Sequence, residues 1–231
     1  MMKKILIILL AMASVSTVVT AQIVRAEELE KYAKTQYGDK WVDAATRLGT
    51  QLPLDKNKSI TFVQVIEAPG KSKAQLYMLL NYWFTSTFNS AEQAIKLNDK
   101  ELGTIIANGF VADIAQHIGG ANRYNVSIRP IIKCDIKEGR IRVTYTLPCY
   151  DVIRVEGGGW LSALDDGKTP PPPKLEEKWT IDSCFPFVNS DSHKKTSSKA
   201  LVMAHAYSNV IIDKIEECVK NGLVGNEDDD W

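Results

Sequence analysis

The amino-acid sequence predicts an α+β fold, in which a curved antiparallel sheet carries two helices on one of its faces. The first observation is the alternation of apolar and polar residues over residues 124–147, which is the period of a sheet with one buried face. The second is a pair of apolar stripes at helical spacing, one after Ser72 and one after Ser192. Because one apolar sheet face and two apolar helix stripes bury one another in two layers, we expect the order β-α-β-β-β-β-α.

The N-terminus predicts a secretory signal peptide over residues 1–21. Lys3 and Lys4 precede a short apolar run, and a Val-x-Ala sequence ends at Ala21, as in a leader and its cleavage site. A transmembrane anchor needs about 20 apolar residues, whereas this run is shorter and is followed by Ser and Thr. We therefore expect cleavage before Gln22 and export to the periplasm or the cell surface.

Three segments follow the signal peptide. Residues 22–58 are predicted to form an N-terminal helical arm, because apolar residues recur there at helical spacing. The α+β domain spans residues 59–222, and residues 223–231 form an acidic tail. Within the domain, residues 156–189 are predicted to form an irregular excursion, because four consecutive prolines favour an extended and poorly hydrogen-bonded chain.

A strand and a helix begin the α+β domain. Residues 59–69 are rich in β-branched side chains and end at a Pro-Gly pair, which predicts a strand. Ser72 and Gln75 have the spacing of a capping box, so the helix begins at Ser72. Trp83 lies at the centre of the apolar stripe of this helix, and the core accounts for its aromatic residues without a cofactor.

Four further strands are predicted between this helix and the excursion. The first two are joined by residues 98–101, whose Asn and Asp side chains are typical of turns. Gly103 and Gly109 lack the context of a phosphate-binding loop, so we expect them to permit a bulge or a close approach of strands. The last two strands are joined by a tight turn of sequence KEGR at residues 137–140.

Four cysteines allow three disulfide pairings: Cys134, Cys149, Cys184 and Cys218. The KEGR turn places Cys134 opposite Val143 and Cys149 opposite Ile128. Cys134 and Cys149 are then about six residues apart along the ladder, or ~20 Å, which exceeds the ~7 Å Cα reach of a disulfide. We expect Cys134 and Cys218 to be buried free thiols, and the alternative of a Cys149–Cys184 disulfide stays open.

The charge of the mature chain argues against a nucleic-acid partner. Removal of the leader takes two lysines from 28 basic residues and leaves 26 against 28 acidic residues, a net charge of −2. Nucleic-acid-binding domains are strongly basic. The polar sheet face carries Arg129, Lys133, Lys137 and Arg142, but Asp135 interrupts them. We interpret this face as an ordinary solvated surface.

The sequence assigns no catalytic, metal-binding or cofactor-binding residue. The motifs G-x-S-x-G, H-E-x-x-H, G-x-x-x-x-G-K-[ST] and C-x-x-C are absent, although convergent triads need no sequence order. The three histidines, His117, His193 and His205, are interpreted as structural or surface residues. The alternative is that His193, His205 and Cys184 together bind a metal ion. The sequence therefore favours a protein without catalytic activity.

Part of the chain resembles a known family. The segments IEAPGKSKAQLY, LNDKELGTIIANG and IKEGRIRVTYTL are similar to a family of uncharacterised exported bacterial proteins, with a TATA-binding-protein-like (TBP-like) fold. The resemblance covers roughly residues 59–154 and implies a Gram-negative source and no established activity. A TBP-like fold does not imply DNA binding, because fold and function separate easily.

Three functions follow from these observations. The first is a non-catalytic interaction module that binds a partner protein through aromatic side chains of the excursion, Trp160, Trp179, Phe185 and Phe187. The second is a protein that binds a small apolar molecule or lipid in a cavity between the sheet and the C-terminal helix, lined by Trp83, Tyr145 and Tyr207. The third, and least favoured, is a hydrolase without a recognisable motif.

Overall fold

The structure is a computed structural model that describes residues 26–88, 91–119, 121–157 and 172–222. The expected signal peptide, Trp160 and the acidic tail lie outside the described residues. The elements in chain order are α1 (Ala26–Tyr37), α2 (Trp41–Gln51), β1 (Ile60–Glu67), α3 (Lys73–Thr87), α4 (Ala91–Ala94), β2 (Ile95–Asp99), β3 (Thr104–Asn108), β4 (Val111–Ile118), β5 (Asn122–Ile128), β6 (Ile131–Lys137), β7 (Arg140–Leu147), β8 (Cys149–Glu156), β9 (Lys174–Thr180), η2 (Ile181–Ser183) and α5 (Lys194–Asn221).

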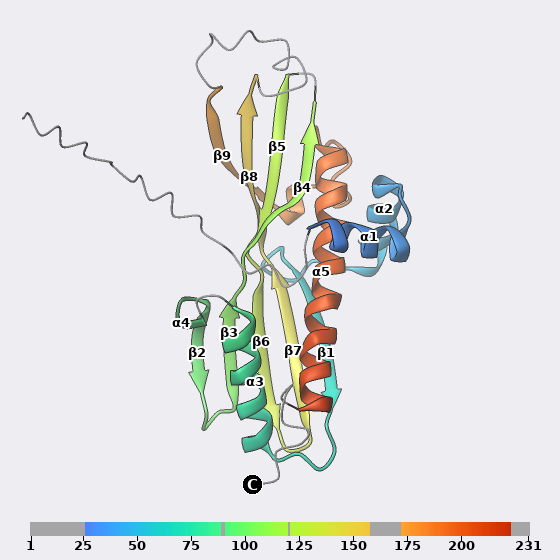
Figure 1. The fold of residues 1–231 in the computed structure, drawn as a ribbon. Helices are drawn as coiled ribbons and strands as arrows, with labels where there is room; N and C mark the ends of the chain where they lie inside the picture. The colour runs from blue at the N-terminus through green and yellow to red at the C-terminus, as the bar shows by residue number, and fades with distance from the viewer. Residues whose placement is uncertain (1–25, 89–90, 120, 158–171, 223–231) are drawn as a thin grey trace, which may run out of the picture.

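The expected α+β class, the antiparallel pairing and the two helices on one face are confirmed, but the sheet is divided in two. A five-stranded sheet has the order β1-β7-β6-β3-β2, and a four-stranded sheet has the order β4-β5-β8-β9. The chain passes from one sheet to the other between β3 and β4, between β5 and β6, and between β7 and β8 (Figure 1). Three long segments of chain therefore each contribute a strand to both sheets.

The hydrogen-bonded ladder is interrupted where glycine and proline residues lie side by side on neighbouring strands. Pro130 lies between β5 and β6, and Pro148 lies between β7 and β8. Because proline has no N–H to donate, a central ladder cannot continue through it. Gly109 donates its N–H to the Pro130 carbonyl at 2.8 Å, and a Cβ on Gly109 would lie 3.0 Å from Pro130 Cγ. The expected close approach at Gly109 is confirmed.

Register follows the predicted alternation below this break and shifts by one residue above it. Cys134 pairs with Val143 across the β6–β7 turn, as predicted. Ile128, however, pairs with Tyr150 rather than with Cys149. The prediction assumed an uninterrupted ladder, whereas Pro148 interrupts it. Gly103 has a positive φ of 68° at the end of the β2–β3 turn, a conformation that favours glycine.

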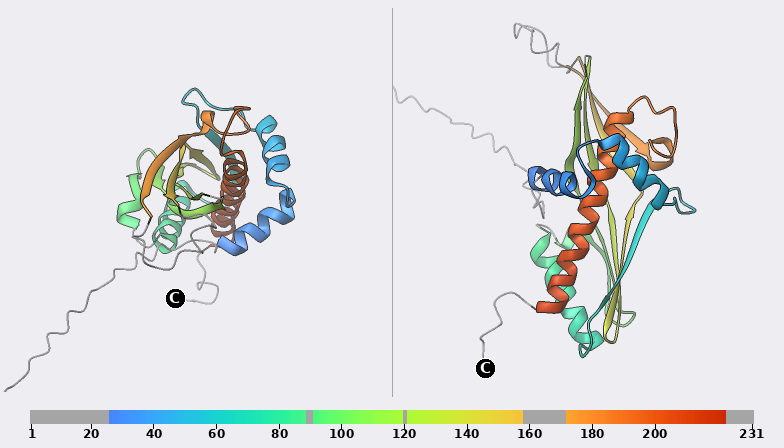
Figure 2. Two further views of the ribbon diagram at one scale, coloured as in Figure 1. Left: turned by 90° about the horizontal axis from the view of Figure 1, so that it is seen from above. Right: turned by 90° about the vertical axis from the view of Figure 1, so that its right-hand side faces the viewer.

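Helices α3 and α5 cover the same face of the five-stranded sheet. The predicted capping box of α3 is present, with Ser72 and Gln75 bonding to each other's backbone. Helix α5 runs the length of the molecule and crosses both sheets (Figures 1 and 2), and it contacts α3, β1, β4 and β5. The core lies between these helices and the sheets. Within the described residues, no helix is long and apolar enough to cross a membrane.

The region expected to be irregular contains a strand. Strand β9 lies inside the expected excursion and pairs with β8 from Cys149–Thr180 to Val155–Lys174. The residues after it are part of the core, since Ile181 and Phe185 are buried. Proline and glycine dominate only part of the segment, so they do not prevent residues 174–180 from adding an edge strand. The expectation that residues 156–189 are irregular throughout is therefore wrong.

We therefore expect two replacements in this region to have different effects on stability. Replacing residues 158–171 with a six-residue Gly-Ser linker keeps β8 and β9, and loop-closure entropy changes by less than ~1 kcal/mol, so the melting temperature shifts by at most about 3 °C. Replacing residues 157–180 removes β9 and the half-buried Trp179. This loss costs about 3 kcal/mol or more, which lowers the melting temperature by roughly 6 °C or more.

Differential scanning calorimetry of the two variants and the unmodified chain measures this difference. Equal melting temperatures for the two variants would show that β9 adds nothing to stability.

Candidate functional site

A cleft lies where α5 begins, against the ends of β4 and β5 and the turn between them. Its volume is about 640 Å³, and we call it the α5 cleft. It is lined by Val42, His117, Gly119, Ala121, Asn122, Tyr124, Ser192, His193, Lys194, Lys195 and Thr196. These residues come from α2, from the ends of β4 and β5 with the turn between them, and from the start of α5 with the two residues before it. Segments far apart in the sequence therefore meet at one place.

Aromatic and imidazole rings form one side of the α5 cleft. The His193 ring stacks on Trp179 at a centroid distance of 4.5 Å and an interplanar angle of 21°. Tyr124 meets the His193 ring edge-on at 4.9 Å and pairs across the strands with His117. Strand β9 thus supplies Trp179 to hold His193, and the antiparallel register of β4 and β5 places His117 beside Tyr124.

The other side of the α5 cleft is cationic. Lys194 and Lys195 are exposed residues of the first helical turn, and Lys194 Nζ lies 4.0 Å from the centre of the Phe185 ring. Among the described residues, no acceptor meets the backbone N–H groups of Lys195 and Thr196. The first N–H groups of a helix lack intrahelical partners, and the helix dipole is positive at this end.

A buried carboxylate fixes the chain that leads into α5. The Asp191 side chain is 6% exposed and accepts hydrogen bonds from the backbone N–H of Phe185 at 2.9 Å and of His193 at 2.7 Å. The Ser197 hydroxyl also donates to it. The helix begins at Lys194 with His193 as its N-cap residue and no side-chain cap, so Asp191 fixes the segment that precedes the helix.

The residues at this helix start do not form a catalytic triad. His193 Nδ1 lies 3.2 Å from the Ser192 hydroxyl and 3.8 Å from Asp191 Oδ1. A triad needs the nucleophile at one ring nitrogen and the carboxylate at the other, whereas here both lie at Nδ1. Within the described ranges, no three His, Cys, Asp or Glu side chains gather to hold a metal ion. The alternative metal set with His205 and Cys184 is therefore not formed.

The cysteines are poor nucleophiles in this fold. All four are free thiols in the structure, and the Cys149–Cys184 disulfide stays a prediction. Burial raises the pKa of Cys134 and of Cys184 to about 12. Burial also raises the pKa of Cys149 and of Cys218. Because the thiolate is the reactive form, none of these side chains is activated at neutral pH.

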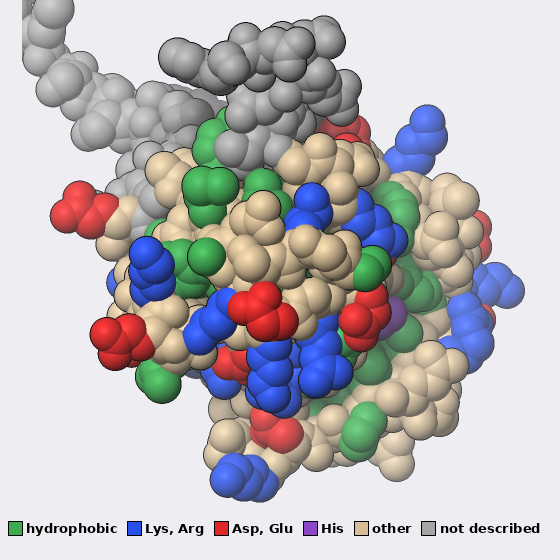
Figure 3. Space-filling view, turned by 90° about the horizontal axis from the view of Figure 1, so that it is seen from below, with side chains coloured by type: hydrophobic (Ala, Val, Ile, Leu, Met, Phe, Trp, Pro, Cys, Tyr) green, Lys and Arg blue, Asp and Glu red, His purple; other side chains and the backbone are tan. Residues whose placement is uncertain are grey.

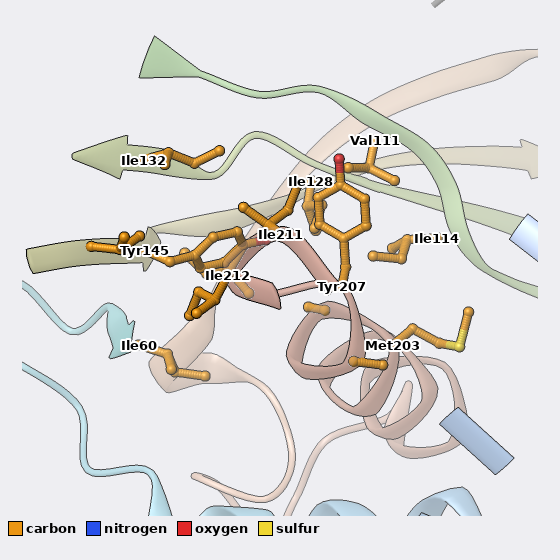
Figure 4. Packing of buried hydrophobic residues seen from close by; sticks show 14 of the residues in the cluster. Ile60, Val111, Ile114, Ile128, Ile132, Tyr145, Met203, Tyr207, Ile211 and Ile212 are labelled. Atoms are coloured by element: carbon orange, nitrogen blue, oxygen red, sulfur yellow. The ribbon is translucent and has the colours of Figure 1, made fainter. Parts of the chain in front are cut away.

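The residues predicted to line an apolar cavity lie in the packed core. Trp83 packs edge-on against Phe84 at 5.0 Å, and its side chain is buried. Tyr145 and Tyr207 lie among close-packed aliphatic side chains of the sheet and of α5 (Figure 4). Burial raises the pKa of both hydroxyls above the usual value. These three residues do not line the α5 cleft, and a cavity formed by them stays a prediction.

The aromatic residues predicted to form an interaction surface are mostly covered. Phe185 is 7% exposed, and Trp179 and Phe187 are half-buried and pack against the core. They stabilise the loop before α5 rather than project from it. The sequence contained one signal for the α5 cleft, namely the run His193-Lys194-Lys195 at the start of a long helix. It gave no sign that His117 and Tyr124 lie opposite, because that depends on the packing of β4 and β5 against α5.

His205 joins the helical arm to α5. Asn209 Nδ2 donates to the Tyr37 hydroxyl at 3.0 Å, so that hydroxyl donates its proton to His205 Nδ1 at 2.6 Å. The imidazole also packs against Phe62 at 4.9 Å. Burial lowers the pKa of His205 to about 4, and burial raises the pKa of Tyr37 to about 12. His205 is therefore a neutral structural residue, as the sequence predicts.

This geometry predicts a pH-dependent loss of stability. The pKa of His205 is about 4 in the folded chain and 6.5 as the reference value, so between these pH values the unfolded chain binds the additional proton. The contribution of His205 to the free energy of unfolding is therefore fully present above pH ~6.5. It decreases by up to about 3 kcal/mol as the pH falls to ~4. Urea unfolding at pH 7, 5.5 and 4.5 measures the change.

The matched control is His205→Gln, which keeps a polar side chain but does not titrate. Carboxylates with lowered pKa values contribute equally in both chains, so the difference between the two pH profiles isolates His205. Parallel profiles would show that His205 does not link protonation to unfolding.

Comparison with known proteins places this fold in a family. Residues 62–150 match the model of DUF4468, described as a domain of unknown function with TBP-like fold. No curated protein matches the chain. A crystal structure of a TBP-like protein from Parabacteroides distasonis is similar at 12% identity and a TM-score of 0.46, over 73% of this chain and 96% of the other. That of a DUF4468 family protein from Bacteroides ovatus is similar at 13% identity and a TM-score of 0.45, over 80% and 94%.

The matched region contains β1, α3 and the strands from β2 to β7. It nearly coincides with the segment over which the three sequence motifs resemble this family. Most of the α5 cleft lies outside it, because helix α5 and the arm are not matched. Over residues 62–150, this chain matches the family DUF4468, a domain of unknown function with TBP-like fold.

Proposed function

We propose that the protein is an exported, non-catalytic binding protein that takes a small organic anion in the α5 cleft. The observation that carries the proposal is the meeting of cationic groups and flat rings in a single cleft of about 640 Å³. Ligand sites are concave, of roughly 300–1,000 Å³, and combine apolar walls with a few polar groups. The α5 cleft fits this description.

The cationic groups select an anion. Lys195 and the unbonded N–H groups of the first turn lie together at the positive end of a helix of 28 residues. Such a helix end favours carboxylates and phosphates. Because Lys194 lies over the Phe185 ring, Lys195 is the lysine more available to pair with a ligand.

The rings select an organic molecule rather than a bare ion. Tyr124 and His193 present ring surfaces to the cleft, and Val42 adds an aliphatic wall. Offset or edge-on contact with a flat ligand stabilises such pairs by ~0.5–1.5 kcal/mol beyond burial. We favour a small-molecule ligand over a protein partner, because the side chains of Phe185 and Trp179 are largely covered.

The absence of catalysis is supported by the geometry around the same cleft. Ser192 and Asp191 both lie at Nδ1 of His193, and the described thiols have raised pKa values. A general base or nucleophile needs hydrogen-bond reach and a suitable pKa. The described residues thus provide ligand recognition without an activated group.

Export is supported by the sequence of the leader, and it predicts a specific N-terminus. Cleavage after Ala21 makes Gln22 the first residue of the mature chain. N-terminal sequencing of protein from the periplasm or culture medium of the expressing bacterium measures this. Exported material that retains Lys3 and Lys4 would rule out this cleavage.

Ligand binding is tested on the purified mature chain with phenyl phosphate, which combines a ring with a dianion. At about ten times its dissociation constant, a ligand stabilises the folded state by ~1.4 kcal/mol, which raises the melting temperature by about 3–6 °C. We expect this shift with phenyl phosphate, a smaller one with inorganic phosphate and none with phenol. Native mass spectrometry of the same preparation reveals any co-purified ligand.

The test variants are Lys195→Gln and His117→Ala, and the control is Lys56→Gln, an exposed lysine of the loop before β1. The shift should disappear in the two cleft variants and persist in the control. Equal shifts in all three variants, or no shift with any probe together with no co-purified ligand, would overturn the proposal.

A further inference from the structure

A second basic surface lies on the outer face of the five-stranded sheet, opposite α3 and α5. It is a groove of about 260 Å³ lined by Val65, Asp135, Lys137, Arg140 and Arg142, and we call it the sheet groove. Val65 pairs with Arg142 on β7, and Arg142 pairs with Asp135 on β6. The next row is Glu67, Arg140 and Lys137. The two rows are two residues apart along each strand and therefore lie on the same face, where they form one continuous patch.

The sheet groove has more positive than negative charge. Asp135 is paired with Lys133 at 3.0 Å and with Arg142 at 2.7 Å. Burial opposes ionisation of Asp135, but hydrogen bonds from Arg142 and Lys133 hold its pKa below the usual value. Among the described residues, Lys137 and Arg140 have no salt-bridge partner. Four cations thus face two carboxylates, with Glu67 as the second.

The sheet groove also exposes apolar surface at the edge of the sheet. Val65 is 50% exposed and Val63 is 58% exposed, both on the edge strand β1. Seen from below, lysine and arginine side chains gather at this end of the molecule with acidic side chains between them (Figure 3). An apolar strip beside unpaired cations fits an acidic segment that carries an aromatic residue.

An acidic segment with a tryptophan follows α5 in the sequence. Residues 223–231 read LVGNEDDDW and follow Gly222, which ends α5 with a positive φ of 81°. The lower end of α5 lies beside β1, because Gln64 Nε2 donates to Glu216 Oε2 at 3.3 Å. Gln64 precedes Val65 on the edge strand β1, so the β1 edge lies beside the last turns of α5.

The length of the segment is sufficient to reach the sheet groove but not the α5 cleft. Nine residues follow Gly222 and span at most ~30 Å when extended, whereas packed layers lie roughly 10 Å apart. The α5 cleft is at the opposite end of a helix of 28 residues, which is ~42 Å long. The acidic residues can therefore reach the sheet groove but not the α5 cleft.

The charge at the end of α5 gives a second reason for the acidic segment to bind the sheet groove. Negative charge is unfavourable after the C-terminus of a helix, where the dipole is negative, and the tail carries Glu227 and three aspartates at residues 228–230. Contact with Lys137 and Arg140 compensates that charge.

We propose that the acidic tail of this chain, residues 223–231, folds around the β1 edge and docks in the sheet groove. Its carboxylates pair with Lys137 and Arg140, and Trp231 packs against Val65 and the Arg142 guanidinium. Because the tail is covalently attached, its effective concentration is on the order of millimolar, which sustains docking through individually weak surface pairs.

The test uses a dye-labelled peptide of sequence LVGNEDDDW and two proteins, the full chain and a chain that ends at Gly222. Fluorescence anisotropy should show that the shortened chain binds the peptide and that the full chain binds it at least fivefold more weakly, because its own tail competes. Binding to the shortened chain should weaken at least tenfold between ~50 mM and ~500 mM salt, as ionic screening requires.

Four variants make the outcome specific. In the shortened chain, Arg140→Glu and Lys137→Glu should each weaken peptide binding at least fivefold, while Lys100→Glu, an exposed lysine of the β2–β3 turn, should not. In the full chain, replacing Asp228, Asp229 and Asp230 by Asn keeps the length of the tail and should restore peptide binding.

Three results would overturn the proposal. Equal binding by the full and shortened chains would show that the tail does not occupy the groove. Failure of the shortened chain to bind, or binding unaffected by Arg140→Glu and Lys137→Glu, would show that the groove does not take the acidic segment. Circular dichroism of each variant confirms that it is folded.

Discussion

Burial of one long helix against two sheets is the constraint on which the rest of the structure depends. Fifteen residues of α5 are buried, and in its first half they lie on nearly every side. A helix covered all round must have neighbours on both sides. The sheet of β4, β5, β8 and β9 covers one side, and α1 and α2 cover the other. The arm is therefore part of the core, because Leu29, Ala45 and Leu48 are buried with α5.

The two polar sites follow from the same helix. Its start meets the ends of β4 and β5 and forms the α5 cleft, and its last turns lie beside the β1 edge of the five-stranded sheet. Asp191 fixes the start through two backbone hydrogen bonds, and the contact of Gln64 with Glu216 fixes the end. The separation of ~42 Å between these ends keeps the two sites independent.

Local patterns predicted the elements well where the pattern was long. The capping box at Ser72 and the alternation through β6 and β7 needed only neighbouring residues and appear as expected. The prediction failed where an element depends on contacts with residues far away in the sequence. Strand β9 has a charged sequence that no local rule marks as a strand, and it forms because β8 offers an unpaired edge. Its exposed lysines and glutamates also suit an edge strand, since they oppose pairing with other chains.

The sequence by itself determined the α+β class, the antiparallel pairing and the phase of each apolar face, because these depend on periodicity along the chain. Tertiary structure alone decided that the sheet is split, since Gly109, Pro130 and Pro148 interrupt the ladder only when they lie at the same level. It also decided which polar residues gather. His117 and His193 are 76 positions apart, and only the packing of β4 and β5 against α5 brings both to one cleft.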